Sequence, residues 1–174
     1  FNWINDASIG NNPPFIIDNI VVTGENTGVE TILNQAVTQI NSQGLVTQFI
    51  SNTNKIIATV TGPNANIGCN TASVQNAGTD RTDIFTNAGS FFRSNKVIKI
   101  TPAITNTNAT YQVTLYYTTA ELAVWGSSAP NLIIMKVNDG VDLSSTLTGA
   151  TTRLLATTFD DQRATKGYAS YTGT

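Results

Sequence analysis

The sequence contains no histidine, only one cysteine and few charged residues. Without histidine, the chain cannot form a Ser-His-Asp triad, a Cys-His pair or a histidine-based zinc site. A single cysteine cannot form an internal disulfide or a CxxC metal site. No apolar run approaches the ~20 residues that a helix needs to span a bilayer. These absences remove several catalytic classes and predict no membrane span.

The charge balance excludes a second class of function. Charged residues make up 11% of the chain, and nine Lys and Arg stand against eleven Asp and Glu. This balance gives no basic excess to attract phosphates, so we expect no nucleic-acid partner. Thr, Asn and Ser together form about a third of the 174 residues. A polar but uncharged surface of this kind is typical of an extracellular β protein.

Short β-prone stretches separated by turn residues recur along the chain. The clearest stretch is 111–117, in which Tyr111, Val113, Leu115 and Tyr117 alternate with more polar neighbours. Such a series predicts an all-β fold, an antiparallel β-sandwich of the jelly-roll or immunoglobulin-like kind. The expected strands are 35–41, 45–50, 55–61, 69–74, 96–101, 111–117, 132–137, 153–159 and 166–171, with turns at 138–140 and 160–162.

One short helix is expected near 118–126. Thr118 and Glu121 have the spacing of a capping box. In this motif the Thr hydroxyl accepts the backbone N–H of the Glu, and the Glu carboxylate accepts the backbone N–H of the Thr. Leu122 and Trp125 lie three apart and can face the core together, and Gly126 can end the helix.

Two residues carry expectations about burial. Cys69 follows Gly68 at the start of an apolar stretch, so we expect a buried thiol that acts as a small hydrophobe. Lys96 and Lys99 flank apolar residues in the 96–101 strand, which predicts a solvent-exposed face there.

The first 24 residues have a pattern of their own. Residues 1–4 and 15–22 read as two strands joined by a loop with the turn residues Pro13 and Pro14. The chain begins with Phe1 rather than with Met and a basic segment, so we expect a mature or excised piece of a longer protein. Residues 1–24 are then the terminal strands of a preceding module or a segment that complements a neighbour, and 25–174 form the sandwich domain.

Several stretches between 45 and 171 resemble a module of large secreted proteins of the Bacteroidetes, which often precedes the sorting domain of the type IX secretion system. The stretches are 67–74, 95–102, 111–122 with Trp125, 131–137 and 167–171. Residues 1–24 look like the end of a preceding jelly-roll module. In similar proteins a final strand rich in Phe and Ser follows, so the resemblance implies that 25–174 lacks its last strand. It also implies export to the cell surface or the medium, and no active site in this module.

Carboxylates at two turns are the first candidate site. Asp139 and Asp142 flank one turn, and Asp160 and Asp161 sit in another. With Asn138 they could supply oxygen ligands to Ca²⁺. No EF-hand spacing is present, and Asp and Asn are equally typical of turns without a metal. A paired-carboxylate glycosidase site would require two acids held in a cleft, which no pattern here indicates.

Aromatic residues on a sheet face are the second candidate site. Tyr116 lies on the face opposite Tyr111 and Tyr117, and Tyr168 and Tyr171 fall near the end of the chain. An exposed row of Tyr116, Tyr168 and Tyr171 would suit stacking on a sugar. The alternative is that most of these rings fill the core or a seam between domains.

Together these patterns predict a non-enzymatic structural or adhesive module of an exported cell-surface protein, able to assemble into filaments. Its expected partners are neighbouring domains or identical subunits that pair through sheet edges. The alternative function is a carbohydrate-binding module attached to a secreted polysaccharide- or protein-degrading enzyme.

Overall fold

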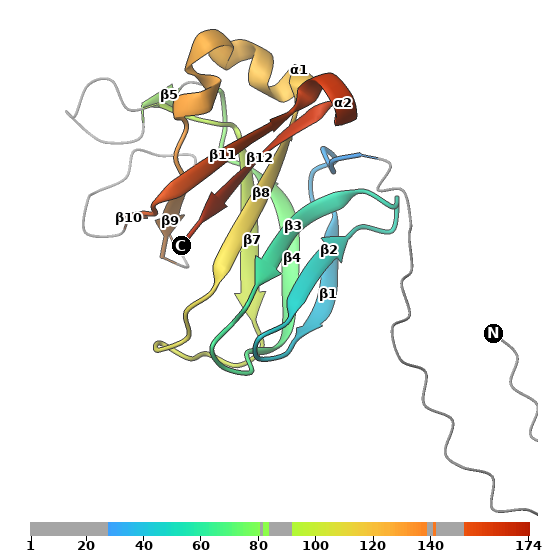
Figure 1. The fold of residues 1–174 in the computed structure, drawn as a ribbon, viewed down its shortest axis with the longest axis vertical. Helices are drawn as coiled ribbons and strands as arrows, with labels where there is room; N and C mark the ends of the chain where they lie inside the picture. The colour runs from blue at the N-terminus through green and yellow to red at the C-terminus, as the bar shows by residue number, and fades with distance from the viewer. Residues whose placement is uncertain (1–27, 81, 84–91, 139–140, 142–151) are drawn as a thin grey trace, which may run out of the picture.

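The computed structural model describes residues 28–80, 82–83, 92–138, 141 and 152–174. In this part of the chain the fold is an antiparallel β-sandwich with two main sheets (Figure 1). The predicted fold class is therefore confirmed. The predicted terminal strands within 1–24, residues 139–140 of the predicted turn at 138–140 and the carboxylates Asp139 and Asp142 lie outside the described residues.

The larger sheet has five strands in the order β11-β12-β8-β3-β2. All neighbouring pairs in it are antiparallel. The last strand of the chain, β12, lies inside this sheet between β8 and β11, so it pairs within its own chain. The bounds are β2 (Val46–Ile50), β3 (Ile56–Thr61), β8 (Gln112–Thr118), β11 (Thr157–Gln162) and β12 (Tyr168–Gly173).

The second main sheet has three strands in the order β1-β4-β7. The chain crosses between the two sheets from β1 to β2, from β3 to β4 and from β7 to β8. Two short hairpin sheets, β5-β6 and β9-β10, complete the described strands. The bounds are β1 (Ala36–Asn41), β4 (Gly68–Asn76), β5 (Thr82–Asp83), β6 (Phe92–Arg93), β7 (Lys96–Pro102), β9 (Met135–Val137) and β10 (Thr152–Leu154).

The alternation predicted for 111–117 places one set of its side chains on the inner face of the five-stranded sheet. Val113, Leu115 and Tyr117 of β8 pack against the buried clusters, as does Tyr111 just before the strand. The main cluster joins the two sheets, because Phe49, Ile57, Ala58 and Val60 come from the larger sheet and Ala72 and Val74 from the smaller one. Burial of these side chains is the main force that holds the layers together.

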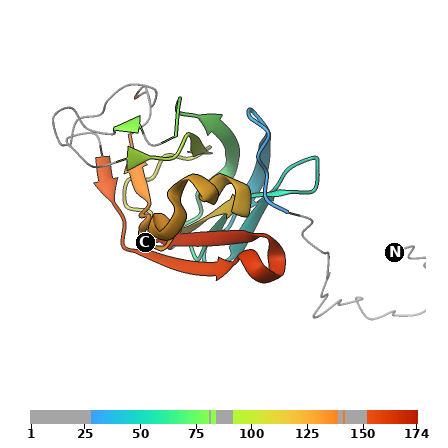
Figure 2. The ribbon, with the colours of Figure 1, turned by 90° about the horizontal axis from the view of Figure 1, so that it is seen from above.

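A helical segment covers one end of the sandwich (Figure 2). The helix α1 (Thr119–Leu122) begins at the predicted capping box: the Glu121 N–H donates to the Thr118 hydroxyl at 3.1 Å, and the Glu121 carboxylate accepts from the Thr118 N–H at 2.8 Å. The 3₁₀ segment η1 (Ala123–Asn131) follows, interrupted at Gly126 with a φ of 51°. Leu122, Trp125 and Ala129 pack with Ala169 and Tyr171 into a second buried cluster.

The end of the chain departs from the predicted elements. The single strand expected over 153–159 is two strands, β10 and β11, which belong to different sheets. The expected turn at 160–162 is the end of β11, because these residues pair with 168–170 of β12. The connection is instead the one-turn helix α2 (Arg163–Lys166), which ends at Gly167 in a left-handed conformation with a φ of 76°.

Candidate functional site

The structure separates the three tyrosines that the sequence grouped. Tyr116 and Tyr168 lie on the outer face of the five-stranded sheet, whereas Tyr171 lies on the inner face. Tyr171 is 2% exposed, and its hydroxyl donates to the carbonyl oxygen of Ala129 at 2.8 Å. It also packs against the rings of Tyr117 and Phe159. A ring held in this way has no face to offer to a sugar at the surface, so of the three only Tyr116 and Tyr168 can form a surface platform.

Tyr116 and Tyr168 form an edge-to-face pair on adjacent strands. Their ring centroids are 5.7 Å apart, and the rings are inclined by 78°. The Tyr116 hydroxyl lies 2.9 Å from the hydroxyl of Thr59 on β3, so β3, β8 and β12 all contribute to this spot. Burial raises the pKa of the Tyr116 hydroxyl above its usual value, which keeps it protonated and able to donate. Both rings are half-buried, and the pair forms a fixed aromatic surface.

A row of threonines crosses the same face beside the tyrosine pair. Thr158, Thr172, Thr114 and Thr59 pair in register across β11, β12, β8 and β3. The hydroxyls of the two central members, Thr114 and Thr172, are 2.9 Å apart and form a hydrogen bond. This face therefore presents an ordered set of neutral hydroxyl groups next to an aromatic pair.

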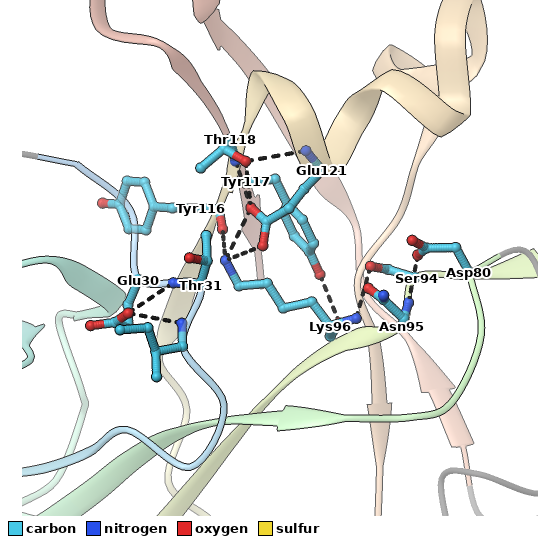
Figure 3. A network of polar contacts seen from close by, with 11 residues as sticks. Glu30, Thr31, Asp80, Ser94, Asn95, Lys96, Tyr116, Tyr117, Thr118 and Glu121 are labelled. Atoms are coloured by element: carbon cyan, nitrogen blue, oxygen red, sulfur yellow. Dashed lines mark hydrogen bonds and ion pairs between the residues drawn. The ribbon is translucent and has the colours of Figure 1, made fainter.

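A buried lysine, which the sequence had placed on an exposed face, forms the second cluster (Figure 3). Lys96 at the start of β7 is 6% exposed. Its Nζ lies 3.1 Å from Oε1 of Glu121 and donates to the carbonyl oxygen of Tyr116 at 3.0 Å. The Tyr117 hydroxyl in turn donates to the carbonyl oxygen of Lys96 at 3.2 Å. The expected exposure of Lys96 is wrong, because the fold brings the Glu121 carboxylate of the capping box within 3.1 Å of the Lys96 amine.

Two opposing effects act on the Lys96 amine. Burial lowers its pKa below the usual value, and the nearby carboxylates of Glu121 and Glu30 only partly offset this. The amine also lies 5.1 Å from the centre of the Tyr117 ring. Burial raises the pKa of the Tyr117 hydroxyl, which therefore remains a donor to the Lys96 carbonyl. The cluster joins β7, β8 and α1 through one charged pair.

A shallow cavity of about 300 Å³ opens beside this pair. Asp80, Lys96 and Glu121 line it together with Thr31 and Leu33 from the segment before β1. The Asp80 carboxylate already accepts the backbone N–H of Asn95 at 2.7 Å. The charged groups at the cavity wall are thus committed to partners within the fold, and the arrangement is that of a structural brace.

A second buried charge lies at the start of the described chain. Glu30 is fully buried, and its carboxylate accepts from the backbone N–H groups of Thr31 and Ile32 and from the hydroxyls of Ser51 and Thr53. Burial alone would raise the pKa of this carboxyl, but the four hydrogen bonds outweigh it and lower the pKa to about 2. Glu30 thereby fastens the segment before β1 to the turn between β2 and β3. No pattern in the sequence marked this residue.

The single cysteine is also placed differently from the sequence prediction. Cys69 is exposed, because it lies on the outer face of β4, where it is paired with Ile40 of β1. Its neighbour Asn70 points inward and is fully buried. Side chains alternate between the two faces along β4, so Asn70 faces the interior and Cys69 faces outward. The apolar residues that flank Cys69 in the sequence did not indicate which of these two residues begins the inner face.

Two further features of the described residues concern metal binding and membrane crossing. Among them, no three His, Cys, Asp or Glu side chains are grouped in a way that could hold a metal ion. The helices in the same part of the chain are all too short or too polar to cross a membrane.

Comparison with known proteins adds no relative. No protein-family model, no curated protein and no solved structure matches this chain.

Proposed function

We propose that the chain is a non-catalytic structural or adhesive module of an exported cell-surface or extracellular protein. The observation that carries the proposal is the use of the buried charges. The Lys96 amine binds the Glu121 carboxylate and a backbone carbonyl oxygen, and the Glu30 carboxylate accepts four hydrogen bonds. Both charged groups therefore hold elements of the fold together. The row of threonines on the outer face of the larger sheet adds support, because its neutral hydroxyl groups do not repel a neighbouring copy.

The test is to locate the protein in the cells that make it. An antibody raised against the chain is used on intact cells, on the culture medium and on the soluble lysate, with and without added protease. We expect the antigen on intact cells or in the medium, and we expect protease to remove the cell-bound signal without lysis. Antigen confined to the soluble lysate and protected from protease would contradict the proposal.

A carbohydrate-binding module is the second candidate, and the Tyr116–Tyr168 pair favours it. Aromatic rings combine apolar faces with a polar handle, which suits the apolar faces and hydroxyls of a sugar. The nearby Thr114 and Thr172 hydroxyls, on half-buried side chains, could donate to or accept from a neutral polysaccharide. The uncharged character of this row favours a neutral sugar over an acidic one.

The second candidate is tested by binding to neutral insoluble polysaccharides such as cellulose, xylan and chitin. We expect Tyr168→Ala to abolish retention and Tyr116→Phe, which keeps the ring, to retain most of it. Thr101→Ala on the outer face of the other sheet serves as the matched control. Equal retention of all variants, or no retention of the unmodified chain, would exclude this function for the tyrosine face.

A further inference from the structure

The four outer edges of the two main sheets differ in how they are protected. Edge strands normally carry charges or proline, which prevent pairing with another chain. The edge strand β7 carries the exposed residues Lys99 and Pro102, and the edge strand β11 carries Asp160 and Asp161. The edge strands β1 and β2 contain no charged residue and no proline. Within the described part of the chain, the β1–β2 side of the sandwich is therefore the side open to another strand (Figure 1).

Of these two strands, β2 has the more accessible backbone. The Gly62 N–H donates to the carbonyl oxygen of Leu45 at 2.9 Å, and the register pairs Thr47 with Val60. Because hydrogen-bonded and non-hydrogen-bonded positions alternate, the N–H and C=O groups of Val46, Gln48 and Ile50 point toward the open edge. On β1, by contrast, the carbonyl oxygen of Ile40 accepts from the Thr47 hydroxyl at 3.3 Å.

We propose that β2 pairs in antiparallel fashion with β2 of a second copy of this chain, centred on Gln48. In this register Gln48 lies opposite Gln48 of the other copy, and Val46 lies opposite Ile50. Each of these pairs exchanges both of its backbone hydrogen bonds, so every outward-pointing group of the strand is satisfied. The five-stranded sheet then continues across the contact into the second copy.

The side chains of β2 favour a second copy over an unrelated partner. Val46 is 63% exposed, and the proposed register covers it with an apolar Ile50 side chain. The two glutamines can hydrogen-bond to each other across the axis. The register also keeps Phe49 on the inner face in both copies, because residues of equal parity oppose each other. The strand is thus complementary to itself.

The contact is expected to be weak. The strand has only five residues, and a standard stable interface buries about 800 Å² on each partner. The inference rests on the proposed structural role, because a module that builds an assembly needs a contact between copies. The proposed pairing identifies β2 as the strand, and Gln48 as the centre of the register, through which that contact forms.

The test is sedimentation velocity on the full chain over a wide concentration range. We expect a reversible shift from monomer to dimer as concentration rises. Gln48→Lys should weaken the dimer by about fivefold or more, because it sets two like charges directly opposite each other. Gln48→Glu should do the same for the same reason. An equimolar mixture of the two variants should restore the dimer, because opposite charges then face each other.

Thr158→Lys on the opposite edge strand β11 is the matched control, since it adds the same charge to an exposed strand position. It should leave the dimer unchanged. A monomer at every concentration, a dimer that Gln48→Lys leaves intact, or a failure of the mixed variants to associate would overturn the proposed pairing. None of these outcomes affects the location of the protein, so a failure of the pairing is distinct from a failure of the proposed function.

Discussion

The carboxylate of Glu30 accepts a hydrogen bond from the hydroxyl of Ser51 at 2.6 Å. This contact joins the first described segment to the turn between β2 and β3, and both residues are buried. A buried carboxylate is costly unless it is fully hydrogen-bonded, and Glu30 is bonded to four donors. The stability of this corner of the sandwich therefore depends on Glu30 being ionised.

Glu30→Gln should lower the free energy of unfolding at pH 7 by about 2 kcal/mol, because an amide replaces a charged acceptor. The folded pKa of about 2 lies below the ordinary value of 4.5, so the Glu30 contribution is complete above pH 4.5 and is lost as pH falls toward 2. Urea unfolding at several pH values should show the difference between variant and unmodified chain shrinking over that range.

Asp161→Asn is the control for this acid dependence. Hydrogen bonds from Arg163 also lower the pKa of Asp161 to about 2, but the pair is exposed to solvent and screened by salt. We expect Asp161→Asn to change stability much less than Glu30→Gln. An equal loss for both variants would contradict the special role of Glu30.

The Lys96–Glu121 pair should show energetic coupling. Lys96→Met leaves the Glu121 carboxylate without its charged partner and should cost about 2 kcal/mol. Glu121→Gln weakens both the pair and the capping box. In a double-mutant cycle measured by chemical denaturation, we expect the two losses to be non-additive by about 1 kcal/mol or more. Strictly additive losses would show that the pair does not act as a brace.

Tyr171 should make the fold sensitive to alkali. Burial raises the pKa of its hydroxyl to about 12, against an ordinary value of 10. Its contribution is therefore present below pH 10 and is lost as pH rises through about 12. Tyr171→Phe should cost about 1 kcal/mol at neutral pH, since the Ala129 carbonyl loses its donor. It should also flatten the alkaline decline followed by circular dichroism.

Cys69 should react in the native state. Its thiol is exposed on β4, so a disulfide reagent such as Ellman's reagent should modify one thiol in each chain without denaturant. Cys69→Ser should abolish the reaction and leave stability nearly unchanged, as is usual for a surface substitution. A thiol that reacts only after denaturation would mean that this part of β4 is covered in solution.

Much of the local structure was predictable from the sequence, because it depends on neighbouring residues. The alternation over 111–117 and the capping box of Thr118 and Glu121 are both found in the structure. The structure does not place Tyr116, Tyr168 and Tyr171 in the single exposed row that the sequence suggested, because Tyr171 is buried. Tyr168 and Tyr171 lie three apart in one strand, and a period of two places them on opposite faces.

The remaining features depend on contacts between residues far apart in the chain. The burial of Lys96 follows from Glu121, which the fold brings above the end of β7, and the burial of Glu30 follows from Ser51 and Thr53 in a distant turn. Composition and local pattern by themselves determined an all-β chain with few charged residues and one capped helix, because these properties arise from side-chain chemistry and short-range periodicity. Only the tertiary structure decided which strands lie at the edges, since strand order is set by long-range pairing. For that reason the uncharged edge of β2 and the inward position of Tyr171 became visible only in the folded chain.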